Sequence, residues 1–180
     1  MNDVAFKLRD RLRQERDVLV QRFNAGGPVD ALLHGLSRSV DRLLREVADA
    51  SGITSRAALI AVGGYGRGEL FPHSDVDILI LLPADSTVED RLRIEPLIGL
   101  LWDLGLELGH SVRTVEECGV EAARDVTVLT SMLESRLIAG PRPLYELFSR
   151  AVVDTLDRRA YFRAKVLEQQ QRHIKYNESP

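Results

Sequence analysis

The chain has 180 residues, of which 44% are hydrophobic and 28% are charged, a balance that fits one soluble globular domain with its own core. With 24 basic and 27 acidic residues the net charge is −3, which disfavours binding to nucleic acid or to a membrane surface. The single cysteine, Cys118, excludes an intrachain disulfide, and the sequence shows no signal-peptide core and no apolar span of membrane length. We therefore expect a cytoplasmic protein.

Two amphipathic helices are predicted at the start of the chain. Apolar residues recur at helical spacing from Val4 to Phe23, and the sequence AGGP at residues 25–28 ends that pattern. A second apolar stripe of helical period follows from Asp30 to Ala50.

Two buried strands joined by a glycine-rich turn are predicted next. The apolar run at residues 57–62 is of strand length, and the turn GGYGRG at 63–68 contains four glycines in six residues. A second apolar run from Val76 to Leu82 follows Ser74 and Asp75. Continuous hydrophobic runs of this kind are typical of strands that are covered on both faces.

Asp75 and Asp77 lie two positions apart at the start of the second strand. An extended backbone points both carboxylates to one face, about 6–7 Å apart along the strand. Such a pair is costly to desolvate, and a divalent cation between the carboxylates removes that cost. The glycine turn supplies backbone that a phosphate can approach closely, because no Cβ intervenes. The two features in this order predict a metal–nucleotide site for phosphoryl transfer.

The chain then returns to helix and to a third strand. A helix is predicted from Thr87 to Leu104, with Trp102 in the core and with Pro96 either bending the helix or marking its effective start. The segment Leu106–Arg113 alternates between apolar and polar residues, which predicts a strand whose polar face includes Glu107.

The remainder of the chain is predicted to be helical. Residues 114–117 (TVEE) form a capping box, in which a threonine and a glutamate three positions later satisfy each other's backbone N–H groups. A helix is expected from Val126 to Leu137, ended by Gly140. Another helix begins near Pro143 and is interrupted near residues 154–157. Apolar strands alternating with amphipathic helices predict an α/β (α+β) fold, with a small mixed sheet of strands near 57–63, 75–82 and 106–113.

The sequence GGYGRGELFPHSDVD at residues 63–77 resembles the DNA polymerase β-like nucleotidyltransferase superfamily, whose signature is a Gly-Ser turn followed by Asp-x-Asp. It is more closely similar to the amino-terminal domain of the bacterial PII uridylyltransferase/uridylyl-removing enzymes. Gly64 stands where many superfamily members have serine, which removes a hydroxyl contact to phosphate and keeps the backbone N–H. The uridylyltransferases share this feature.

The resemblance implies transfer of UMP from UTP to a tyrosine hydroxyl of the PII nitrogen-signalling protein, with release of pyrophosphate. It also implies Mg²⁺ held by Asp75, Asp77 and a third carboxylate on a later strand, the position that Glu107 matches. Nucleotide contacts are implied for five further residues: Gly63, Gly64, Gly66, Arg67 and Ser74.

Several alternatives remain open at this stage. Glu107 could be an exposed edge-strand charge, with Asp103 and Glu69 as rival third ligands. The same motif serves adenylyltransferases and other nucleotidyltransferases with a different acceptor, and a regulatory module could bind nucleotide without turnover.

The resemblance also suggests a division of the chain. We expect N-terminal helices over residues 1–50, a nucleotidyltransferase core over 51–140 and the start of a helical subdomain over 141–180. On this interpretation the chain is a fragment of a longer protein, and by itself it has weak activity or none.

Overall fold

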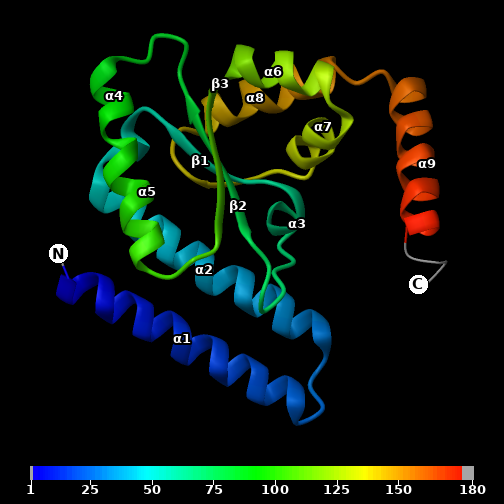
Figure 1. Cartoon of the computed structure of the whole chain (residues 1–180). Helices are drawn as coiled ribbons and strands as arrows, with labels where there is room; N and C mark the ends of the chain where they lie inside the picture. The colour runs from blue at the N-terminus through cyan, green and yellow to red at the C-terminus, as the bar shows by residue number, and fades with distance from the viewer. Residues whose placement is uncertain (1, 176–180) are drawn as a thin grey trace.

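The computed structural model describes residues 2–175 and is built around a small mixed sheet. Its strands are β1 (Ala58–Ala61), β2 (Val76–Leu82), β3 (Leu108–Thr114) and β4 (Arg136–Ala139), in the spatial order β3-β2-β1-β4 (Figure 1). β2 and β3 run parallel, whereas β1 pairs antiparallel with both β2 and β4. The predicted fold class, a small mixed sheet flanked by helices, is confirmed.

β4 was not predicted, and the helix expected from Val126 to Leu137 is wrong in its second half. Helix α7 covers only Val126–Leu133, and the chain then turns into β4, where Leu137 pairs with Ile60 of β1. The β4 segment has only four residues, most of them apolar, and follows an apolar helix, so it is too short to show a periodicity of its own. The partner strand therefore decides the conformation, and that strand is remote in sequence.

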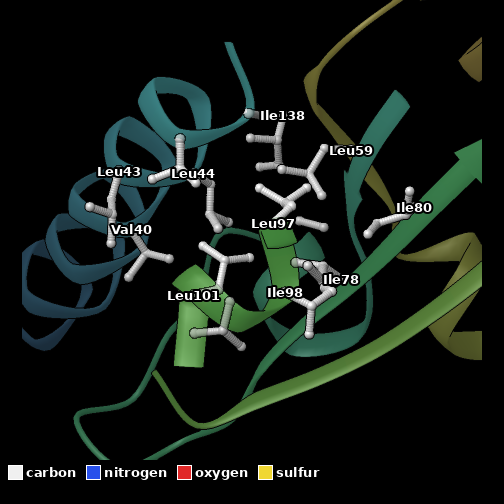
Figure 2. Packing of buried hydrophobic residues seen from close by; sticks show 14 of the residues in the cluster. Val40, Leu43, Leu44, Leu59, Ile78, Ile80, Leu97, Ile98, Leu101 and Ile138 are labelled. Atoms are coloured by element: carbon white, nitrogen blue, oxygen red, sulfur yellow. The ribbon is translucent and has the colours of Figure 1, made fainter. Parts of the chain in front are cut away.

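One face of the sheet is covered by helices that come from the first part of the chain. α1 (Asn2–Asn24) packs along α2 (Val29–Ser51), and α2 packs on the sheet together with α5 (Ile94–Asp103). Figure 2 shows this core, in which side chains of α2 and α5 meet the inward side chains of β1 and β2. The labelled residues are Val40, Leu43, Leu44, Leu59, Ile78, Ile80, Leu97, Ile98, Leu101 and Ile138.

The opposite face is covered by α6 (Val115–Arg124), α7 and α8 (Arg142–Asp154), as Figure 1 shows. Alternate residues of β1 and β2, such as Ile60, Leu79 and Leu81, form a second core there with Cys118 and Phe148. Burial on both faces explains why these strands read as continuous apolar runs. The predicted capping box at the start of α6 is confirmed.

The last helix, α9 (Arg158–Lys175), follows a break at residues 155–157, which confirms the predicted interruption. In the part of the chain that the structure describes, no helix is both long enough and apolar enough to cross a membrane.

The helix predicted from Thr87 to Leu104 is divided in two. α4 (Val88–Leu92) and α5 are separated at Arg93, and Pro96 occupies the first turn of α5, where proline is tolerated. The placement of Trp102 in the core was wrong. Its side chain is 57% exposed, and its ring meets the His110 ring edge-on at 5.8 Å.

Candidate active site

Asp75 immediately precedes β2, and Asp77 is the second residue of that strand. Strand alternation places Asp77 on the same face as Leu79, which is the face covered by α6, α7 and α8. On the neighbouring parallel strand, Gly109 stands directly opposite Asp77. A Cβ at position 109 would overlap Asp77 Oδ1, so the carboxylate occupies space that only a glycine leaves open.

The two carboxylates are not neutralised by the protein. Partial burial raises the pKa of Asp77, and the negative charge of Asp75 adds to that shift. Among residues 2–175, no side chain forms an ion pair or hydrogen bond with either carboxylate. Two hard oxygen donors that repel each other are the chemical setting that a divalent cation such as Mg²⁺ stabilises.

The glycine turn lies against the Asp77 carboxylate. It forms a single helical turn, α3 (Gly63–Gly66), and is joined to β2 by a hydrogen bond from the Val62 N–H to the Asp77 carbonyl at 3.1 Å. A Cβ at Gly63 would lie 3.4 Å from Ser131 Oγ and 3.7 Å from Asp77 Oδ2. Gly63 also has φ +59°, a left-handed conformation that glycine adopts readily. The turn and the Asp77 carboxylate are therefore neighbours, and we treat them as one candidate site.

The three glycines that were expected to bind phosphate have different surroundings. A Cβ at Gly66 would overlap the Glu134 carbonyl oxygen, and the Gly66 N–H already donates to Val62 at 3.0 Å. Close packing is therefore sufficient to explain this glycine. The first N–H groups of a helix have no acceptor within it, and phosphate binding by the N–H groups of Gly63 and Gly64 stays a prediction.

Arg67 and Ser74 lie at the two ends of the loop that joins the turn to β2. The Arg67 guanidinium is held by Glu69 at 3.1 Å and Glu134 at 2.5 Å, and these carboxylates raise its pKa. The pairs use Nε and Nη1, whereas Nη2 lies 3.6 Å from the position of a Cβ at Gly64, so contact between Arg67 and a phosphate stays a prediction. Ser74 is exposed, and its predicted role in orienting Asp75 stays a prediction.

Glu107 lies just before β3, and its carbonyl accepts a hydrogen bond from the Val76 N–H at 2.7 Å. The register of β2 and β3, extended by one residue, places Glu107 opposite Asp75 and on the same face. Its side chain is exposed. Within residues 2–175, no three His, Cys, Asp or Glu side chains are grouped closely enough to hold a metal ion. The role of Glu107 as third ligand stays a prediction.

A buried polar network holds the turn in place, and the sequence analysis missed it. The Tyr65 hydroxyl donates to Asp41 Oδ1 at 2.6 Å, and Arg136 donates to both Asp41 oxygens at 2.6 and 3.1 Å. Arg136 also donates to the Tyr65 carbonyl at 3.2 Å. Burial raises the pKa of Tyr65, and the adjacent Asp41 raises it further, so its hydroxyl stays protonated. The network fixes the turn between α2 and β4.

A cleft of about 210 Å³ adjoins the site on the same face. It is lined by residues of β2, β3 and α7 and by the residue that follows β1: Val62, Leu79, Ser111, Arg113, Thr127, Val128, Ser131 and Met132. These residues were not predicted as site residues. The sequence could have indicated Ser111 and Arg113. They lie two and four residues after Gly109 on the same strand, so their side chains are on the same face of the sheet as Asp77. For Ser131 no sequence signal existed.

The sequence profile of the family described as "Nucleotidyltransferase domain" matches residues 40–176, which contain the turn, both aspartates and the whole sheet. The chain belongs to this nucleotidyltransferase family. The predicted resemblance is thereby confirmed, and the protein is a transferase enzyme.

The nucleotidyltransferase chain is similar to much longer relatives. It is 52% identical over 162 residues to the "Bifunctional uridylyltransferase/uridylyl-removing enzyme" of Burkholderia mallei, of Burkholderia pseudomallei and of Burkholderia thailandensis. The match covers 90% of this chain and 19% of each relative, so the chain spans about a fifth of their length. Among solved structures, a mutant of the toxin–antitoxin MntA-HpeT aligns with 77% of this chain and 98% of its own, at 13% identity and a TM-score of 0.38.

Proposed function

We propose that this nucleotidyltransferase transfers UMP from UTP to a tyrosine hydroxyl of the PII signalling protein and releases pyrophosphate. The observation that carries the proposal is the pair of carboxylates, Asp75 and Asp77, with which no basic side chain among residues 2–175 forms an ion pair, and of which Asp77 lies beside Gly63. The choice of UTP and PII rests on the 52% identity to the uridylyltransferase/uridylyl-removing enzymes.

In this proposal the chain holds and orients the reactants. Asp75 and Asp77, with Glu107 as the proposed third ligand, would hold Mg²⁺, which supplies charge neutralisation of the triphosphate and lowers the pKa of the acceptor hydroxyl. In the proposal the N–H groups of Gly63 and Gly64, at the start of α3, donate to phosphate oxygens. The tyrosine oxygen forms a bond to the α-phosphorus, the bond from that phosphorus to the leaving pyrophosphate breaks, and the phenolic proton departs.

The cleft that adjoins Asp77 has the chemistry to receive more of the nucleotide. Hydroxyl groups of Ser111 and Ser131 and the guanidinium of Arg113 lie among apolar side chains there. A small number of polar groups in an apolar surround is typical of sites that orient a small ligand.

The experiment is mass spectrometry of intact PII after incubation with this protein, Mg²⁺ and either UTP or ATP. The proposal predicts addition of one uridylyl group per modified tyrosine with UTP and no addition with ATP. Transfer from ATP would instead identify an adenylyltransferase. Modification of a serine or of another protein would contradict the proposed acceptor, and nucleotide binding without transfer would indicate a regulatory module.

A further inference from the structure

A second cleft, of about 270 Å³, lies at the end of the sheet where β2 and β3 begin. We name it the α1 cleft. It is bounded by one side of α1, by α2, and by the loops that lead into the two strands, and the residues that matter here are Arg9, Arg13, Arg16, Ser74, Val76 and Glu107. Figure 1 shows α1 on the side of the sheet away from α6, α7 and α8.

The charge of this cleft is opposite in sign to that of the chain. Arg9, Arg13 and Arg16 recur at a spacing of four and three residues, which places them on one side of α1. Among the described residues that line the cleft, Glu107 is the single acidic one. The chain as a whole carries a net charge of −3, so this concentration of arginine is local.

The three arginines form few ion pairs with carboxylates among the described residues. Arg13 pairs with Asp10 at 3.0 Å on the exposed surface of α1, and Arg16 approaches Asp17 only to 4.0 Å. Within residues 2–175, Arg9 has no carboxylate at ion-pair distance, and its guanidinium lies against Gly105. Exposed pairs of this kind contribute about 0–1 kcal/mol each, so an incoming anion competes with them easily.

The wall of the cleft between these arginines is apolar. Leu12 of α1 and Leu36 and Val40 of α2 meet Leu70 and Leu104 from the loops. A ligand that fits this cleft therefore combines negative charge with apolar groups. A short acidic peptide segment has this composition.

The position of the cleft relative to the carboxylates suggests how such a segment is used. Ser74 and Val76 line the cleft on either side of Asp75 in the sequence, but Val76 points to the α2 face, whereas Asp77 points to the opposite one. The cleft therefore borders the proposed phosphoryl-transfer site, shares Ser74 and Glu107 with it, and lies at the same end of β2. An extended peptide advances about 3.3 Å per residue, so two to four residues span about 7–13 Å along this end of the sheet.

We propose that the α1 cleft docks an acidic segment of the acceptor protein, located two to four residues from the tyrosine that receives the nucleotide. This inference rests on the proposed function, because it assigns a docking surface to the same acceptor. Removing the arginine charges is expected to weaken binding of the acceptor and to leave binding of UTP unchanged.

The first test measures peptide binding without nucleotide or metal. A fluorescein-labelled twelve-residue peptide, with glutamates two to four residues from a central tyrosine, is titrated and followed by fluorescence anisotropy. The same peptide with glutamine in place of each glutamate is its control. The triple variant R9E/R13E/R16E is expected to bind the acidic peptide at least about tenfold more weakly than the unchanged protein.

The control variant is Arg22→Glu, which reverses the charge of one exposed arginine in the last turn of α1, outside the cleft, whereas the triple variant reverses three. It is expected to bind the acidic peptide within about twofold of the unchanged protein. Thermal unfolding of each variant checks that the fold is retained.

The inference is overturned if the acidic and glutamine peptides bind equally, or if Arg22→Glu weakens binding as much as the triple variant. It is also overturned if the triple variant loses affinity for UTP, measured by calorimetry with Mg²⁺, because the cleft would then be a nucleotide subsite. Failure of the proposed function would be seen in a different measurement, the modification of PII. PII would then gain no uridylyl group, while acidic-peptide binding that depends on the three arginines would still support an acidic docking surface.

Discussion

Asp77 and Gly109 stand opposite each other on the parallel strands β2 and β3, and the Asp77 carboxylate fills the space that a side chain at position 109 would need. The conformation of one proposed metal ligand thus depends on a residue that has no chemistry of its own. This relationship makes the glycine a direct probe of the site.

Gly109→Ala is expected to displace the Asp77 carboxylate. Overpacking of this kind costs about 1–3 kcal/mol of unfolding free energy, and Mg²⁺-dependent binding of UTP should fall at least about tenfold. Calorimetry with UTP and Mg²⁺ measures the second effect. Gly119→Ala on α6 is the matched control, because nothing lies within 4 Å of a Cβ at that position. Full UTP affinity in Gly109→Ala would show that the carboxylate position is not needed.

Asp77→Asn is expected to keep or raise the stability of the metal-free protein at neutral pH. The pKa of Asp77 in the folded state is raised above its unfolded value, so the unfolded state releases the proton first as pH increases. The contribution of Asp77 to the free energy of unfolding is therefore lost as the pH rises from its pKa in the unfolded state to its pKa in the folded state. Asparagine does not titrate, so the variant does not lose this stability. Urea unfolding at about pH 3 and at about pH 7 should show an advantage of the variant only at the higher pH. A variant that is less stable at neutral pH contradicts this account of the electrostatics.

The Tyr65–Asp41–Arg136 network predicts different losses of unfolding free energy for two substitutions. Tyr65→Phe removes one hydrogen bond and leaves Asp41 bound to Arg136, so it should cost about 1–2 kcal/mol of unfolding free energy. Asp41→Ala leaves the Arg136 guanidinium without its carboxylate partner and should cost about 3–5 kcal/mol. Urea denaturation of both variants gives the comparison. Equal losses would mean that the ion pair does not anchor the turn.

Glu107→Gln tests the third carboxylate. If Glu107 helps to hold the metal, the variant should keep its thermal stability without metal, because the side chain is exposed and unpaired among the described residues, and should need more Mg²⁺ for transfer. Asp103→Asn, an exposed rival at the end of α5, is the control and should leave the Mg²⁺ requirement unchanged. The reverse pattern would assign the ligand to Asp103.

Local sequence was sufficient to predict the strand–turn–strand unit at the centre of this fold. Buried strands, a glycine turn and the spacing of Asp75 and Asp77 all depend on neighbours in the chain, and the structure brings the turn and the carboxylates together. The break before α5 and the capping box of α6 were predicted for the same reason.

The features that were missed are those that depend on distant residues. β4 forms because it pairs with β1, and Arg136 reaches Asp41 across 95 positions of the chain. The contacts of Arg136 could not be predicted from the sequence, because its segment was predicted as the end of a helix. Trp102 was misplaced because helical spacing indicates a face but not whether another element covers it.

The central claim is that nucleotidyl transfer takes place at Asp75 and Asp77. The most direct measurement is transfer of label from UTP carrying a radioactive α-phosphate to PII, with equimolar amounts of this protein, in Mg²⁺, for the unchanged chain and for Asp77→Asn. We predict labelled PII with the unchanged chain and a rate lower by at least about 100-fold with the variant. Labelling of PII by Asp77→Asn at a rate within about twofold of the unchanged chain would contradict the account, because the chemistry would then lie elsewhere.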